Sequence, residues 1–333
     1  MWSKGLKKEI TVNKLASIGD ILALELSKMD LNGHDECDLI FSNCKFGKPL
    51  PMLIAGREIR ALTRNNPKVK FTLISRGGNF QGYADHVGFF RYCGFDRGNH
   101  LGQAEGSRNF TPITAYNLDA LREASGDRPY AEIIEEKSTE LTRLLLRTDS
   151  GDVFAIIQYS IREILRNCME HSEARGAIVF GQYWPTTGEA DIVIYDTGIG
   201  LQGSLLSAGL LAESNSRRAI ELALEPGVSA ISEAERQYQD QHYRNSGFGL
   251  YVTSTFFGNF GNFKVITGDC GLDIKKGKRN FHDWNFQGTC INLRFNANSI
   301  TAGREEIRRI VQEGEQKIGG KTAASASSKS LPF

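Results

Sequence analysis

The sequence lacks the features that mark several large classes of protein. Cysteine is scarce, with 6 residues among 333, and no two of them form a C-x-x-C pair, so neither a zinc site nor a disulfide scaffold is expected. No apolar run reaches the roughly 18 residues of a membrane helix, and residues 1–10 are basic without the apolar core of a signal peptide. Membrane attachment is therefore disfavoured. The cysteines predict free, mostly buried thiols in a reducing compartment, most simply the cytoplasm.

An excess of charge of one sign is also missing. The 40 Lys and Arg residues balance 39 Asp and Glu, which disfavours a protein built to coat nucleic acid. The basic cluster Lys275, Lys276, Lys278 and Arg279 is interpreted as a solvated hairpin tip. What is abundant is glycine, at 35 residues, which predicts loops that need bare backbone. The length suits about two domains of roughly 150 residues.

Residues 8–116 alternate between strand and helix patterns, which predicts an α/β domain over 1–125 with some parallel pairing. Strands are expected at Glu9–Asn13, Asp38–Ser42, Val69–Ser75 and Phe110–Tyr116, and helices at Ser17–Met29, Pro51–Asn65 and Tyr83–Cys93. Ser17 is the expected N-cap of the first helix. His86 beside Asp85 is interpreted as a capping or packing residue.

A charged helix over Tyr130–Arg147, within a connecting segment 126–149, is expected to join the two halves, and a role in a homodimer stays open. A second domain is expected over 150–300, beginning with a helix at Val153–Glu173. An amphipathic helix should follow over 301–318, and residues 319–333 are small and polar, which predicts a disordered tail.

Two short patterns in the second domain could carry chemistry. Glu163 and Asn167 lie four positions apart on one helix face, where a carboxylate and a carboxamide could hold a metal ion and activate water. Asp196 directly follows a strand and precedes Gly198 and Gly200, so an acceptor lies beside exposed backbone and suits a planar donor such as the adenine amine. Taken alone, the first pattern is more typical of a solvated polar face and the second of a glycine turn.

Two further patterns follow along the chain. Gly247, Gly249 and Leu250 open a helix, and backbone N–H groups at such a start bind phosphate well. Thr289 begins an alternating strand and could hydrogen-bond a base or a water. The alternatives are an ordinary helix start and an ordinary strand residue.

The order of these patterns carries more information than any one of them. The chain runs E-x-x-x-N on a helix, a strand ending in D-x-G-x-G, a loop of about 45 residues, G-x-G-L opening a helix, and G-T on a strand. This order, over residues 150–296, resembles the ATP-binding (Bergerat) α/β sandwich of the GHKL superfamily. That superfamily includes DNA gyrase, heat-shock chaperone ATPases, histidine kinases and mismatch-repair ATPases. The wording E-I-L-R-N-C-M-E-H-S is most similar to the anti-sigma-factor serine kinase branch.

The resemblance implies a role for each matching residue. Glu163 would be the general base, and Asn167 would hold Mg²⁺. Asp196 would accept the adenine amine, with Thr289 helping at that end and Gly198 and Gly200 making room for the nucleotide. Around the phosphates the resemblance implies Gly247, Gly249 and Leu250, with Arg244 neutralising charge. The first half more loosely resembles STAS-like domains found beside such ATPases.

The function expected from this resemblance is a cytoplasmic, Mg²⁺-dependent ATP-binding regulatory protein that hydrolyses ATP or transfers phosphate to Ser or Thr of a protein partner. The alternative is a nucleotide-gated interaction module with little turnover, in bacterial stress signalling or phage defence by analogy. A sensor histidine kinase is disfavoured, because residues 130–147 contain no His to accept phosphate. Residues 201–245, long and polar, are expected to form a lid.

Overall fold

The computed structural model describes residues 6–103, 109–120, 130–170, 172–230, 247–300 and 303–319. Contacts divide the chain into two compact units, Met1–Ser107 with Thr111–Thr114 and Arg108–Phe110 with Ala115–Phe333. The fold is mixed α/β, with one sheet in each unit. The tail expected over 319–333 lies almost entirely outside the described residues.

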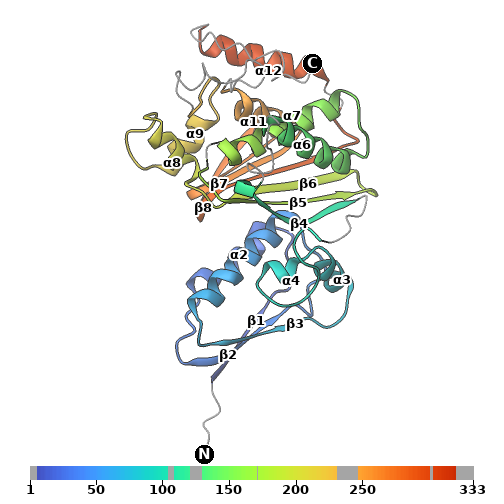
Figure 1. Ribbon diagram of the computed structural model, residues 1–333, viewed down its shortest axis with the longest axis vertical. Coiled ribbons are helices and arrows are strands. Elements are labelled where there is room, and N and C mark those ends of the chain that lie inside the picture. Colours follow the sequence, from blue (N-terminus) through green and yellow to red (C-terminus); the bar gives the residue numbers. More distant parts are fainter. Residues whose placement is uncertain are drawn as a thin grey trace, which may run out of the picture. The chain divides into compact units, whose positions relative to one another are not determined.

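The first unit contains a parallel sheet of three strands in the order β1-β2-β3, covered by the long helix α2 and several short helices (Figure 1). The strands are β1 (Leu6–Thr11), β2 (His34–Ile40) and β3 (Lys70–Ile74), and the helices are α1 (Ile18–Leu22), the 3-10 turn η1 (Leu26–Lys28), α2 (Pro49–Asn65), α3 (Asn79–His86) and α4 (Phe89–Tyr92). Parallel pairing requires crossover connections, and here the helices supply them. The predicted α/β layer with parallel pairing is thus confirmed for three of its four expected strands, whereas the strand expected at Phe110–Tyr116 belongs to the five-stranded sheet.

Two helices of this unit are shorter than the sequence predicts. Ser17 does cap α1, through a capping box with Asp20, but the helix ends early and Glu25 adopts a left-handed conformation with φ of 47°. The single helix expected over Tyr83–Cys93 is interrupted at Gly88, where φ is +79° and a Cβ would lie 3.1 Å from the Asn99 carbonyl oxygen. Apolar residues keep helical spacing through both breaks, so neither the early end of α1 nor the interruption at Gly88 could be predicted from that spacing.

The second unit is built on a five-stranded sheet in the order β4-β5-β6-β8-β7. Its strands are β4 (Phe110–Asn117), β5 (Gly176–Trp184), β6 (Glu189–Asp196), β7 (Gly261–Lys275) and β8 (Lys278–Asn296), and the β5–β6, β6–β8 and β7–β8 pairs are antiparallel. Its helices are α6 (Tyr130–Leu146), α7 (Asp152–Glu170), α8 (Gly200–Ser207), α9 (Ser216–Ala223), α11 (Gly249–Phe260) and α12 (Arg304–Lys317).

Helices α6, α7 and α11 lie over one face of this sheet (Figure 1). The apolar stripe of α7, which includes Ile157, Ile161 and Ile164, packs in one core with sheet residues such as Ile194 and Ile291. The amphipathic pattern of α7 therefore fixes which of its side chains face the sheet and which lie at the rim. This places the α7 residues near the end of β6 and the middle of β8, where Tyr195 pairs with Cys290.

The β7–β8 hairpin is longer than expected, since Thr289 was predicted to begin its strand but lies well inside β8, which begins at Lys278. Its register is irregular around Gly268, whose φ of +56° brings the backbone close to Ser216 of α9. Polar residues such as Asp273 and Asn280, which pair across the outer half, hid the strand pattern there. Lys275 pairs with Lys278 at the tip, so the basic cluster does surround a hairpin turn.

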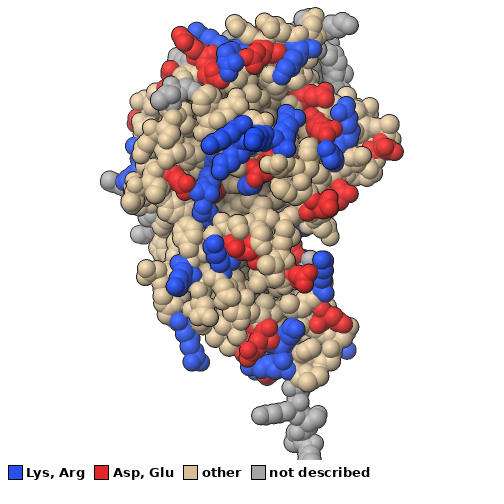
Figure 2. Space-filling view, turned by 180° about the vertical axis from the view of Figure 1, so that it is seen from behind, with Lys and Arg blue, Asp and Glu red and all other residues tan. Residues whose placement is uncertain are grey.

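All six cysteines are free and buried, as expected. Among the described residues, no helix combines the length and apolarity needed to cross a membrane. Figure 2 shows basic and acidic side chains interspersed on one face of the molecule, in keeping with the balanced composition.

Candidate functional site

Residues from every pattern singled out in the second domain line one cavity. The empty space that these residues surround is about 800 Å³ and includes volume that is open to solvent. The predicted residues along its wall are Glu163, Asn167, Asp196, Gly200, Gly247, Gly249, Leu250 and Thr289. They come from α7, the end of β6, the start of α11 and β8, so the fold brings together segments that are distant in sequence.

Asp196 forms the buried polar end of the cavity, with only 2% of the residue exposed. Its carboxylate accepts a hydrogen bond from the Gly198 N–H at 2.8 Å, and the Thr289 N–H and the Cys168 thiol also donate to it. Burial raises the pKa of Asp196 to about 6, although these hydrogen bonds favour the ionised form. The apolar residues Ile194 and Ile291 line the same cavity, which suits a planar ring with a polar edge.

The loop after Asp196 depends on glycine for packing. A Cβ at Gly198 would lie 1.8 Å from the Ser172 carbonyl oxygen, which also accepts a hydrogen bond from the Ile199 N–H. Gly198 does not line the cavity. The sequence predicted that it makes room for the nucleotide, but its bare backbone makes room for the chain that follows α7. Gly200, with φ of +72°, does line the cavity, and its Cβ would lie 2.7 Å from Thr267 Oγ1.

Thr267 and Gly288 pack behind this corner of the site. Gly288 is the glycine of the G-T pattern, whereas Thr267 was not predicted from the sequence. Thr267 is fully buried, and its hydroxyl accepts from the Leu201 N–H at 3.2 Å and donates to the Gly288 carbonyl at 2.9 Å. Gly288 has φ of +91°, and a Cβ there would lie 2.1 Å from the Asp196 carbonyl oxygen. Backbone packing therefore requires the glycine of the G-T pattern. The Thr289 contribution to the site is its backbone N–H, which donates to the Asp196 carboxylate.

Another part of the cavity wall is built from backbone. Gly247 has φ of +71°, and its carbonyl accepts from the Gly227 N–H at 3.1 Å. Gly249 is the first residue of α11, so the first backbone N–H groups of that helix have no partner within the helix. A Cβ at Gly249 would lie 2.4 Å from Glu163 Oε2, which shows how closely the helix start approaches the carboxylate.

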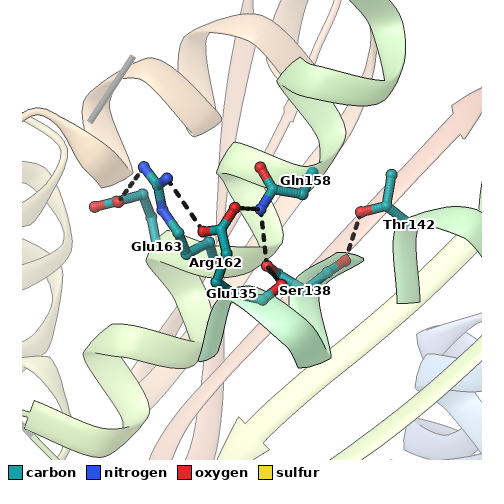
Figure 3. A network of polar contacts seen from close by, with 6 residues as sticks. All are labelled: Glu135, Ser138, Thr142, Gln158, Arg162 and Glu163. Atoms are coloured by element: carbon teal, nitrogen blue, oxygen red, sulfur yellow. Dashed lines mark hydrogen bonds and ion pairs between the residues drawn. The ribbon is translucent and has the colours of Figure 1, made fainter. Parts of the chain in front are cut away.

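Glu163 is 6% exposed and takes part in a polar network between α6 and α7 (Figure 3). Its Oε1 lies 3.3 Å from Nη2 of Arg162, whose Nη1 lies 3.5 Å from Oε2 of Glu135 on α6. Asn167, one turn further along α7, is half-buried on the cavity wall. The carboxylate and the carboxamide therefore do share the cavity side of the helix.

Two further predictions, the role of Arg244 and the lid over residues 201–245, fall largely on residues that the structure does not describe. Arg244 lies outside the described residues, as does most of the second half of the expected lid. Of that segment, the structure describes α8 and α9, which are anchored to β7 because the Ser216 hydroxyl donates to Gln202 Oε1 at 2.6 Å and accepts from the Asp269 N–H at 3.3 Å. Cys168 and Arg162 were not selected from the sequence, since neither a lone buried cysteine nor an arginine beside a glutamate indicates a site by itself.

A divalent cation would find few protein ligands here. Among the described residues, no group of three or more His, Cys, Asp or Glu side chains is arranged to hold a metal ion. Mg²⁺ usually keeps several waters and takes one or two protein oxygens together with phosphate oxygens. The Asn167 amide beside the start of α11 fits an ion that is held mainly by phosphates.

Comparison of the chain with protein-family models, with curated proteins and with solved structures gives no match.

Proposed function

We propose that the second unit binds ATP with Mg²⁺ in this cavity, and that the protein hydrolyses ATP or transfers phosphate to Ser or Thr of a protein partner. The observation that carries the proposal is the meeting of a buried carboxylate, an apolar ring-sized space, a glycine-rich helix start and a Glu–Asn pair in one cavity. The order of the same residues along the chain, which resembles the GHKL superfamily, supports it independently.

In this proposal each end of the cavity recognises one end of the nucleotide. Asp196 accepts a hydrogen bond from the exocyclic amine of adenine, while Ile194 and Ile291 cover the ring. The backbone at Gly247 and Gly249 lies at the start of α11, where N–H groups and the helix dipole favour phosphate. Asn167 offers its amide oxygen to Mg²⁺, which would neutralise phosphate charge.

Glu163 has the position required of a general base in this scheme. Its Oε2 lies beside Gly249, the first residue of α11, so in this scheme the carboxylate would face the phosphates. There it would orient a water, or the hydroxyl of a partner's Ser or Thr, and take its proton. The first unit, with its parallel α/β layer, would be the STAS-like part that engages the protein partner.

One observation favours the second candidate, a nucleotide-gated module with little turnover. Glu163 Oε1 is paired with the Arg162 guanidinium, so one of the two carboxylate oxygens is already engaged before any nucleophile arrives. Such a protein would bind ATP and change its partner contacts while hydrolysing slowly. The two candidates share the site and differ only in the rate of the chemical step.

The test measures ATP affinity by calorimetry with and without Mg²⁺, and then single-turnover hydrolysis. An Asp acceptor suits the adenine amine and opposes the carbonyl that guanine carries at the same position, so ATP should bind at least about tenfold more tightly than GTP. Asp196→Asn should weaken ATP binding and reduce this preference, whereas the exposed control Asp149→Asn should do neither. Equal affinity for ATP in the parent and in Asp196→Asn would exclude the adenine assignment.

A further inference from the structure

Arg162 lies between two carboxylates that belong to different helices (Figure 3). Nη2 is 3.3 Å from Glu163 Oε1 on α7, and Nη1 is 3.5 Å from Glu135 Oε2 on α6. The guanidinium is largely buried, with 16% of the side chain exposed, and its Cζ lies 5.2 Å from the centre of the Tyr159 ring. A planar guanidinium has donors on both amino groups, so it can hold two carboxylates at once.

Glu135 is in turn fixed against α7 by neighbouring polar groups. Gln158 Nε2 donates to Glu135 Oε1 at 2.6 Å and to Ser138 Oγ at 3.1 Å, and the Ser138 hydroxyl donates to the Glu135 carbonyl at 2.9 Å. Both carboxylate oxygens of Glu135 are thus engaged, one by Gln158 and one by Arg162. Because Ser138 and Gln158 are buried, these bonds depend on α6 and α7 remaining in register.

The two oxygens of Glu163 have different surroundings. Oε1 faces Arg162, whereas Oε2 lies beside Gly249 at the phosphate end of the cavity. A contact that holds Oε1 therefore determines where Oε2 points. A chain of contacts runs from α6 through Glu135 and Arg162 to the oxygen that would meet the nucleophile.

We propose that Arg162 is a positioning residue through which α6 sets the orientation of the Glu163 carboxylate. The catalytic consequence rests on the proposed function. When Glu135 holds Nη1, the guanidinium is fixed and so is Glu163. When α6 shifts and Glu135 moves away, the Arg162 guanidinium loses one of the two carboxylates that hold it and follows Glu163. The Glu163 carboxylate is then misplaced, although the nucleotide contacts are intact. Since the Glu135 side chain is 49% exposed, a protein that binds α6 can act on turnover by this route.

Four single-turnover measurements test the connection: the parent, Glu135→Gln, Arg162→Met and the double variant. We expect Glu135→Gln to lower the rate about fivefold and Arg162→Met about thirtyfold, with ATP affinity unchanged within about threefold. In the Arg162→Met background, Glu135→Gln should change the rate by less than about twofold, because its effect passes through Arg162. Glu140→Gln is the matched control, since Glu140 pairs with Lys137 on the same helix at 2.8 Å. That control should leave the rate unchanged.

Rate effects that multiply independently in the double variant would overturn the proposal, as would an equal effect of Glu140→Gln. If Arg162→Met does not fold, Arg162→Lys replaces it, because an ammonium is a point charge that cannot bridge both carboxylates in the same way. If the parent does not hydrolyse ATP, the proposed turnover fails and thermal unfolding without nucleotide decides the inference. The midpoint shift of the Glu135→Gln, Glu163→Gln double variant should then differ by about 2 °C from the sum of the two single shifts. In the Arg162→Met background the two shifts should be additive. Additivity with Arg162 in place would reject the connection.

Discussion

Gly249 and Glu163 are so close that a Cβ on Gly249 would lie 2.4 Å from Oε2 of Glu163 and 3.0 Å from its Cγ. The first residue of α11 and the carboxylate of α7 therefore share one small space on the cavity wall. The nearest atom, Oε2, is at the end of the Glu163 side chain, and Cγ and Cβ follow at 3.0 and 3.1 Å. An added Cβ would therefore push the carboxylate out of its contact with Arg162. A side chain at position 249 would thus displace the carboxylate more readily than it would unfold the protein.

Gly249→Ala should therefore separate activity from stability. Alanine is the better helix former by about 1 kcal/mol, which offsets part of the cost of moving Glu163, so the thermal midpoint should change by less than about 3 °C. Single-turnover hydrolysis should fall at least about tenfold, because the base leaves its position. The control is Gly82→Ala on α3, where a Cβ would meet nothing within 4 Å. An active Gly249→Ala protein would mean that the Glu163 position does not matter for turnover.

Glu163→Gln and Asn167→Ala should fail in different ways. Without the Glu163 carboxylate, ATP and Mg²⁺ still fit but nothing accepts the proton, so binding should survive while turnover falls by about 10²- to 10⁴-fold. Without the Asn167 amide, the metal loses a ligand, so Mg²⁺-dependent ATP affinity and turnover should fall together. ATP affinity with and without Mg²⁺, followed by single-turnover hydrolysis at matched thermal stability, distinguishes them. Small, similar losses in both variants would indicate a structural role for this helix face.

The residues that the sequence singled out lie along one cavity, whereas the ends of several helices and strands differ from those predicted. Glu163 and Asn167 could be placed on one face because helical spacing is regular, and Asp196 could be placed at a strand end because its apolar run stops there. What could not be predicted are contacts between distant segments. The packing of Gly198 against Ser172 depends on how the chain returns after α7, which no local pattern encodes.

Arg162 illustrates the same limit for electrostatics. The sequence shows an arginine beside a glutamate, and the pairing of both with Glu135 becomes visible only once α6 lies along α7. Similarly, the break at Gly88 follows from the left-handed backbone needed near Asn99 and not from the apolar spacing around it. Local patterns thus predicted the types of most elements, whereas tertiary contacts decided where some of them end.

Nucleotide binding should slow hydrogen exchange along one wall of the cavity. Val228, Ser229 and Ala230 line the cavity outside any helix or strand, so a bound nucleotide would restrict their backbone. We expect ATP with Mg²⁺ to slow exchange there at least about tenfold, relative to the free protein. Amides in β5 that are remote from the cavity, such as that of Tyr183, serve as the internal control. Equal rates with and without ATP would contradict the assignment of this segment to the site.

Asp196 should make the protein less stable as the pH rises. Its pKa is 3.8 in an unfolded chain and is raised to about 6 in the fold, because burial disfavours the charged carboxylate. Between these two values the unfolded chain releases the proton while the folded protein keeps it, so each increase in pH favours unfolding. The contribution of Asp196 is therefore fully present below about pH 4 and lost as the pH passes through about 6. The total loss is on the order of 3 kcal/mol.

The difference between the parent and Asp196→Asn isolates this effect from all other titrating groups. Asparagine has no proton to lose, so the variant should gain stability relative to the parent from pH 4 to pH 7 and hold a constant difference above that. Denaturant unfolding at a series of pH values measures the difference, and the exposed Asp149→Asn serves as the control with no such slope. A buried carboxylate that costs stability at neutral pH would be retained for what it binds, which is why the same variant should lose ATP affinity. A pH-independent difference in stability between the parent and Asp196→Asn would show that Asp196 stays in one protonation state throughout. It would contradict the proposal that Asp196 is a buried carboxylate that costs stability at neutral pH and is retained for binding.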